Sequence, residues 1–173
     1  MEKPGSNTNK SGKTFKAAKP VKLSDIETKN IQRMQTKSSE LDRVLGGGLV
    51  PGSFILLGGE PGIGKSTLSI QIASMIPNCL YISGEESVEQ IKLRADRLKL
   101  QTPTLHLLNE THLETILATI HEVKSPLVFI DSIQTMYTSE VEGEPGNISQ
   151  LRACTAKLLE AAKSTNTAII LIG

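Results

Sequence analysis

One stretch of this chain has the residue types and the spacing that bind phosphate groups. It follows the pattern G-x-x-x-x-G-K-[ST] and reads Gly59-Glu60-Pro61-Gly62-Ile63-Gly64-Lys65-Ser66. Backbone N–H groups of such a loop cradle phosphate oxygens, and the helix that begins behind it adds positive potential. The lysine reaches the β- and γ-phosphates, and the serine hydroxyl ligates Mg²⁺. The stretch therefore predicts a phosphate-binding loop, or P-loop, that takes ATP with Mg²⁺.

The flanking residues provide the strand and the helix that this motif requires. Residues Phe54–Gly58 are apolar and indicate a short buried strand, and Thr67–Ile76 indicate a helix that ends before Pro77. The alternative is a glycine-rich strand–helix turn that binds nothing, which a chance match of eight positions in this context disfavours. We predict nucleotide contacts from Gly59, Glu60, Pro61, Gly62, Ile63, Gly64, Lys65, Ser66 and Thr67.

Carboxylates elsewhere in the chain could complete the site. Asp131 ends the apolar run Leu127–Ile130, and ligands of parallel sheets bind beyond the carboxyl ends of strands, so we expect Asp131 to hold the Mg²⁺ shell as the Walker B residue. The alternative is an N-cap of the next turn. Glu85 and Glu86 follow the predicted strand Leu80–Ser83. Either could polarise the attacking water, or both could simply favour the start of the next helix.

Short apolar runs alternate with amphipathic segments along the rest of the chain. The predicted strands are Phe54–Gly58, Leu80–Ser83, Thr104–Leu108, Leu127–Ile130 and Thr167–Ile172. The predicted helices are Ser38–Leu45, Thr67–Ile76, one that begins at Ser87 with Gln90 in a capping box, one that begins at Thr111 with Glu114 in another, and Ile148–Lys163. This alternation predicts an α/β fold, a mainly parallel sheet with helices on both faces.

Composition limits the chain to one soluble globular domain. It has 173 residues, of which 38% are hydrophobic and 21% charged, with a net charge of +1. Residues 1–22 hold six lysines and one glutamate, so this part carries +5 and the remainder −4. Residues 1–21 are nearly free of large apolar side chains, which predicts a disordered basic linker, with the folded domain in residues 22–173.

The sequence indicates no zinc site, disulfide, membrane span or secretory signal. Cys79 and Cys154 are isolated, so neither zinc nor a disulfide is expected. The chain contains neither an apolar run of membrane-spanning length nor a secretory signal, which predicts a cytoplasmic protein without a membrane partner.

Four segments together resemble the bacterial RadA/Sms family of recombination and repair ATPases, over about Leu23 to Gly173. They are Glu40–Ser53, Gly58–Thr67, Tyr81–Ser87 and Ile130–Tyr137. The resemblance implies a RecA-like P-loop NTPase core, assembled as a homo-hexameric ring, that binds single-stranded DNA and promotes branch migration of recombination intermediates. It also implies that Lys65 and Ser66 bind phosphate and Mg²⁺, that Asp131 is the Walker B residue, and that Glu85 is the water-activating catalytic carboxylate.

The loop Thr138–Asn147 is similar to the first DNA-facing loop of that family. Its side chains Glu140, Glu142 and Glu144 are acidic, which argues against their direct contact with DNA phosphates.

The chain departs from the family at both ends. The amino-terminal zinc module, the segment with the γ-phosphate sensor and second DNA-facing loop, and the Lon-protease-like domain are missing, which indicates an incomplete piece of a longer protein. In RecA-like sheets the strand after Walker B, here Thr167–Ile172, lies between the P-loop strand and the Walker B strand. The strand that would cover the other side of Phe54–Gly58 belongs to the missing part. We therefore expect the P-loop strand to be an exposed apolar edge, prone to aggregation. We also expect the isolated chain to be a poor ATPase.

Two other functions remain open from the sequence. One is a KaiC-like regulatory ATPase without a DNA role, and the other is a nucleotide-binding fragment without turnover. Turnover that DNA stimulates would distinguish a DNA-dependent motor from both.

Overall fold

The computed structural model describes residues 19–25 and 32–173. The chain divides into two units, Met1–Asn30 and Ile31–Gly173, which are described separately. In the first unit, residues 19–25 are exposed and contain a single 3-10 turn, η1, at Leu23–Asp25. The predicted linker, residues 1–21, lies outside the described residues except for 19–21, so its character stays a prediction.

The second unit is built on a parallel sheet of five strands. These are β1 (Phe54–Leu57), β2 (Leu80–Ser83), β3 (His106–Asn109), β4 (Leu127–Asp131) and β5 (Ala168–Ile172). They lie in the order β1-β5-β4-β2-β3, and every neighbouring pair is parallel. The last strand in the chain is therefore inserted between the P-loop strand and the strand that ends in Asp131, as predicted. Within the described residues β1 is an edge strand, and 67% of Leu56 is exposed.

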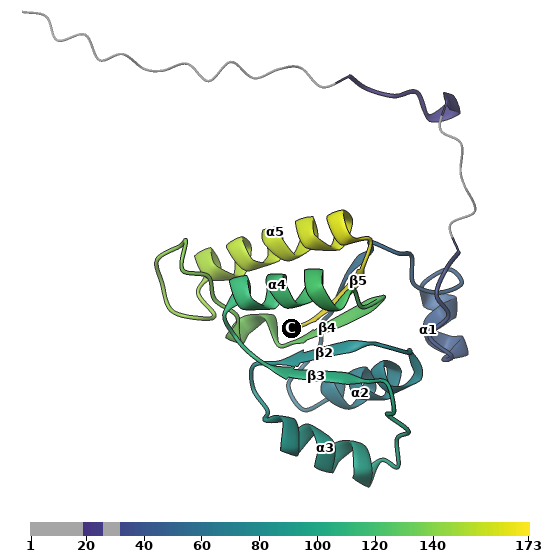
Figure 1. Cartoon of the computed structure of the whole chain (residues 1–173), viewed down its shortest axis with the longest axis vertical. Helices are drawn as coiled ribbons and strands as arrows, with labels where there is room; N and C mark the ends of the chain where they lie inside the picture. The colour runs from purple at the N-terminus through teal and green to yellow at the C-terminus, as the bar shows by residue number, and fades with distance from the viewer. Residues whose placement is uncertain (1–18, 26–31) are drawn as a thin grey trace, which may run out of the picture. The chain divides into compact units, whose positions relative to one another are not determined.

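Helices cover both faces of this sheet (Figure 1). On one face α4 (Leu113–Val123) and α5 (Ile148–Thr165) pack on the strands, and on the other face lie α2 (Lys65–Met75) and α3 (Val88–Arg97). Each face has its own buried apolar cluster, because side chains alternate along a strand. The predicted α/β class, with a RecA-like core, is confirmed. None of the described helices combines the length and apolar character that a membrane span requires.

A short helix precedes the P-loop strand. This is α1 (Ser39–Val44), where the Ser38 side chain accepts a hydrogen bond from the N–H of Leu41. The glycines after it, Gly46, Gly47 and Gly48, have positive φ, which ends the helix. Arg33 then donates to the carbonyls of Leu45 and Gly48 at 2.9 and 3.1 Å, so its guanidinium holds this glycine turn together.

Several predicted element bounds differ from the structure by one or two residues, and one predicted capping box is absent. β3 begins at His106 rather than Thr104, because the residues before it form a turn in which the Leu105 N–H bonds to the Thr102 carbonyl at 3.4 Å. The predicted capping box before α4 is wrong, since His112 is the N-cap and makes no side-chain cap bond. Glu114 instead accepts a hydrogen bond from the Thr138 hydroxyl, across to the loop after β4. The other capping box, at the start of α3, is confirmed.

Gly84 allows a close approach between the end of β2 and two neighbouring segments. Its N–H donates to the Asp131 carbonyl at 2.9 Å. A Cβ atom at this position would lie 2.2 Å from Thr135 Oγ1 and 2.8 Å from Thr111 Cγ2. These separations are far below van der Waals contact, so a side chain here forces the segments apart.

We therefore expect Gly84→Ala to lower the free energy of unfolding by about 1–3 kcal/mol, the usual cost of overpacking. Urea unfolding would measure this, with Gly58→Ala as the matched control because a Cβ there meets nothing within 4 Å. Equal unfolding midpoints for the two variants would contradict the expectation.

The two cysteines should be unreactive in the folded protein. Cys79 and Cys154 are both fully buried, and burial raises the pKa of each thiol. A raised pKa keeps the thiol protonated at about pH 8, and only the thiolate is a good nucleophile. We expect slow reaction with a chromogenic disulfide reagent in native buffer and rapid release of two equivalents in denaturant. Rapid native labelling of either thiol would show that the core opens readily.

Candidate nucleotide-binding site

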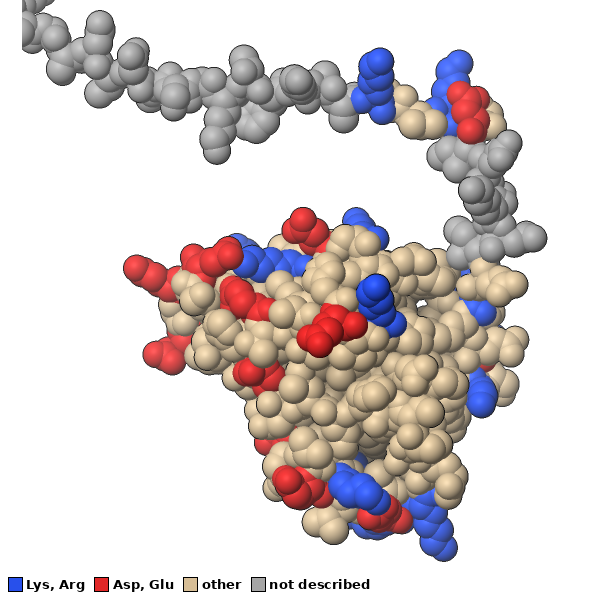
Figure 2. Space-filling view, viewed as in Figure 1, with Lys and Arg blue, Asp and Glu red and all other residues tan. Residues whose placement is uncertain are grey.

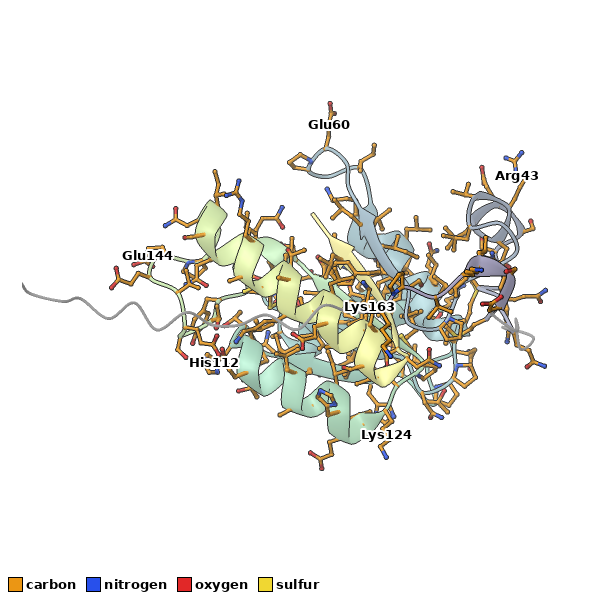
Figure 3. The ribbon with its side chains drawn as sticks, turned by 90° about the horizontal axis from the view of Figure 1, so that it is seen from above. Arg43, Glu60, His112, Lys124, Glu144 and Lys163 are labelled. Carbon is orange, nitrogen blue, oxygen red and sulfur yellow. The ribbon has the colours of Figure 1, made fainter. Side chains whose placement is uncertain are left out.

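The P-loop connects the carboxyl end of β1 to α2. Gly62 and Gly64 have φ of 79° and 103°, in the left-handed region that other residues rarely adopt. A Cβ on either would meet no atom within 4 Å, so backbone conformation rather than space requires glycine at both positions. Glu60 lies near the tip of the loop, which projects away from the sheet (Figure 3).

The amino terminus of α2 is open to an anion. Its N-cap is Gly64, which makes no side-chain cap bond, and the first turn of this helix holds no acidic residue. The helix α3, by contrast, is capped by Ser87. An uncapped helix start presents N–H groups without an intrahelical acceptor and the positive end of the helix dipole. The loop and this helix start therefore fit phosphate groups.

Lys65 lies across the P-loop. Its ammonium donates to the carbonyl of Gly59 at 2.6 Å and to that of Glu60 at 3.0 Å. These bonds hold the cation beside the backbone that would surround a phosphate. The lysine is the first residue of α2, so its position follows directly from where the helix begins.

A cavity of about 660 Å³ opens beside the loop, within the size range of small-ligand sites. Its lining residues are Gly59, Pro61, Gly62, Gly64, Lys65, Ser66, Thr67, Glu85, Arg94, Arg97, Asp131, Ser132, Gln134, Ile172 and Gly173. The structure thus brings the P-loop, Glu85 and Asp131 together. Of the nine predicted contact residues, Glu60 and Ile63 do not line this cavity.

Asp131 is the last residue of β4 and is only 5% exposed. Its Oδ2 atom accepts a hydrogen bond from the Tyr81 hydroxyl at 2.5 Å. Ser132, rather than Asp131, is the N-cap of the following turn η2 (Ile133–Thr135), which removes the alternative role considered for this aspartate. A carboxylate beside a hydroxyl such as that of Ser66 is the donor set that Mg²⁺ prefers, so these residues fit the ion.

Glu85 and Glu86 have different surroundings. Glu85 lines the cavity, and its Oε1 atom accepts a hydrogen bond from the Ser132 hydroxyl at 2.5 Å. Glu86 does not line this cavity and instead pairs with Arg94 of α3. The geometry therefore distinguishes two adjacent carboxylates that residue spacing alone left open and between which the family resemblance favoured Glu85.

Four cavity residues with polar side chains were not singled out from the sequence. Ser132 and Gln134 lie within the segment Ile130–Tyr137 that carried the family resemblance, so that segment was their signal. Arg94 and Arg97 are three residues apart on α3, which places them on one side of the helix that follows Glu85. Basic residues at this spacing, directly after a candidate catalytic carboxylate, are the pattern that could have identified them.

The loop Thr138–Asn147 is acidic, and the Gln150 side chain bonds to its backbone at three residues. Gln150 of α5 donates to the carbonyls of Val141 and Gly143, at 2.6 and 3.1 Å, and exchanges bonds with the backbone of Thr138. The glutamates of this loop are exposed, and Figure 2 shows acidic side chains gathered at this end of the unit. Glu144 points outward (Figure 3). This surface repels phosphate groups rather than attracting them.

Comparison with known proteins identifies relatives of this chain. The AAA domain family matches residues 17–173. The protein named DNA repair protein RadA of Bacillus subtilis is 48% identical over 159 residues, which cover 90% of this chain and 35% of the relative. The protein of the same name from Streptococcus pneumoniae is 44% identical over 163 residues, covering 92% and 39%. That of Listeria monocytogenes is 47% identical over 164 residues, covering 92% and 36%.

The chain thus spans between a third and two fifths of the length of these relatives. The part that the AAA domain family matches, residues 17–173, contains the P-loop, both cavity carboxylates and the five described strands. The chain belongs to the AAA domain family, and the resemblance to RadA that its sequence predicts is confirmed.

Proposed function

We propose that this chain is the ATP-binding and ATP-hydrolysing core of a DNA repair ATPase. One observation carries the proposal: the P-loop, Asp131 and Glu85 line a single cavity at the carboxyl ends of three parallel strands. The names of the relatives support the repair role.

The residues divide into those that bind and those that act on water. The P-loop amides and the start of α2 hold the phosphates, Lys65 leaves the loop carbonyls to contact the β- and γ-phosphates, and Thr67 lies near the α-phosphate. Ser66 and Asp131 would hold Mg²⁺, which would supply positive charge against the phosphate oxygens. Lys65, Glu85 and Asp131 are the proposed catalytic residues.

Glu85 would orient the attacking water and accept its proton. The hydrogen bond from Ser132 occupies one carboxylate oxygen and fixes the direction of the side chain. The second oxygen then remains to accept a bond from water. Glu86 is tied to Arg94 and supports the start of α3 instead.

In the full-length protein we propose a homo-hexameric, cytoplasmic, DNA-dependent motor that acts on single-stranded DNA and recombination intermediates by branch migration. A KaiC-like ATPase without a DNA role is the second candidate, and the acidic loop Thr138–Asn147 favours it. ATP hydrolysis with and without single-stranded DNA distinguishes the two. Stimulation by DNA supports the motor, and hydrolysis that DNA leaves unchanged supports the regulatory ATPase.

Replacing Lys65 should weaken nucleotide binding. We expect Lys65→Ala to reduce affinity for ATP·Mg²⁺ by about tenfold or more, because a charge-assisted contact to phosphate is worth about 1.5–3 kcal/mol. Isothermal calorimetry measures the affinity. Lys163→Ala, an exposed lysine in the last turn of α5, is the control and should bind as the wild type does. Unchanged affinity in Lys65→Ala would refute the P-loop assignment.

The two glutamates should separate binding from chemistry. In the full-length protein we expect Glu85→Gln to lower the hydrolysis rate by about 10²–10⁴ while nucleotide affinity stays near normal, since a general base acts in the transition state. Glutamine still accepts the bond from Ser132, so the site geometry is retained. Glu86→Gln is the matched control and should have the milder effect in single-turnover assays. The reverse ranking would assign the base to Glu86.

A further inference from the structure

The hydroxyl of Tyr81 is placed against Asp131 by the register of the sheet. In the β2–β4 pairing Tyr81 lies beside Phe129, and Ser83 lies beside Asp131. Side chains two residues apart on one strand share a face, so Tyr81 and Asp131 are diagonal neighbours on the face that α2 and α3 cover. Diagonal pairs lie about 7–8 Å apart at their Cα atoms, a gap that a long side chain spans. The tyrosine hydroxyl reaches Oδ2 of Asp131 at 2.5 Å.

Tyr81 is fixed in this position by burial. It is 1% exposed, and its ring stacks on that of Phe129 with centroids 5.8 Å apart and planes at 29°. Phenylalanine would fill the same space, and a buried hydroxyl requires a partner that an apolar ring does not. Here that partner is a carboxylate of the nucleotide cavity, so the hydroxyl contributes to the site and not only to the core.

The charges around Tyr81 keep its hydroxyl protonated and therefore a donor. Burial raises the pKa of Tyr81, and the neighbouring Asp131 raises it further. The Arg94–Glu86 pair also lies close enough to act on this phenol, with Arg94 lowering its pKa and Glu86 raising it. The net direction is upward, so Tyr81 keeps its hydroxyl proton at neutral pH and donates a hydrogen bond to Asp131.

We propose that Tyr81 is a positioning residue that holds the carboxylate of Asp131 in the orientation that supports Mg²⁺ with the nucleotide. The inference rests on the proposed function. The hydrogen bond occupies Oδ2 and so directs Oδ1 of the same carboxylate. Asp131 lines the cavity together with Ser66, the other proposed Mg²⁺ residue. Partners that orient the ligands of a metal are typically worth about 10–100-fold in affinity or activity.

The test is the Mg²⁺ dependence of nucleotide binding in Tyr81→Phe. Affinity for a fluorescent ATP analogue is measured over a Mg²⁺ series and in EDTA. We expect the nucleotide affinity of Tyr81→Phe in EDTA to match that of the wild type. The factor by which Mg²⁺ increases this affinity, the Mg²⁺ gain, should fall about tenfold or more. The chain has two tyrosines, so Tyr137→Phe is the matched control and should keep the full gain. Equal Mg²⁺ gain in Tyr81→Phe and the wild type would overturn the inference.

A double-mutant comparison with Asp131→Asn tests whether Tyr81 acts through the aspartate. If it does, Tyr81→Phe has no further effect on the Mg²⁺ gain once Asp131 is changed. An equal additional loss in that background would refute a positioning role. A wild-type chain whose nucleotide binding does not depend on Mg²⁺ would overturn the proposed function, and this inference with it. An intact proposed function with an unaffected Tyr81→Phe would overturn the inference alone.

A measurement on unaltered Tyr81 covers the case in which Tyr81→Phe does not fold. The chain has no tryptophan, so in Tyr137→Phe the emission of tyrosine comes from Tyr81 alone. A carboxylate that accepts a bond from a phenol quenches its fluorescence. Mg²⁺ added with an unlabelled, non-hydrolysable ATP analogue should therefore change this emission. Emission that stays constant while calorimetry reports binding would overturn the inference.

Discussion

The site depends on the parallel pairing of β1, β5, β4 and β2. Parallel strands end at the same edge of a sheet, so the P-loop, Asp131 and Glu85 are brought together although they are far apart in the sequence. The insertion of β5 between β1 and β4 sets the lateral distance between the P-loop and Asp131. A parallel sheet also needs helical crossovers, and one of these, α2, has the uncapped start that fits phosphate groups.

Lys65 and the carboxylates of Asp131 and Glu85 line the same cavity, but each of these groups bonds to a different partner. Asp131 is held by the hydroxyl of Tyr81 and Glu85 by that of Ser132, while Arg94, which also lines the cavity, pairs with Glu86 outside it. Lys65 meanwhile bonds to backbone carbonyls of its own loop. Asp131, Glu85 and Lys65 therefore each have a neutral local partner, and these bonds are weaker than a direct ion pair between Lys65 and a carboxylate would be. Such an arrangement leaves the lysine exchangeable toward phosphate and keeps the carboxylates fixed.

The sequence predicts those features of the fold and the site that depend on the pattern of neighbouring residues. The P-loop, the alternation of strands and helices and the capping box at Ser87 are encoded by neighbouring residues, and the position of β5 came from the resemblance. The contacts of Tyr81 with Asp131 and of Ser132 with Glu85 join residues 50 and 47 positions apart. The predicted capping box of Thr111 and Glu114 is wrong for the same reason. Glu114 accepts a hydrogen bond from the Thr138 hydroxyl instead, and local spacing does not reveal this contact.

The acidic loop Thr138–Asn147 constrains the proposed DNA role. Gln150 fixes its backbone through three donated bonds, while its glutamates remain exposed. One of them, Glu140, is paired with Lys157 at 2.5 Å, whereas Glu142 and Glu144 form no ion pair within the part of the chain that the structure describes. Side chains of this sign cannot release counterions from a phosphate backbone. If this loop faces DNA, its contribution must therefore come from backbone N–H groups or contacts to bases, and the attraction to phosphates must arise on other surfaces of the full-length protein.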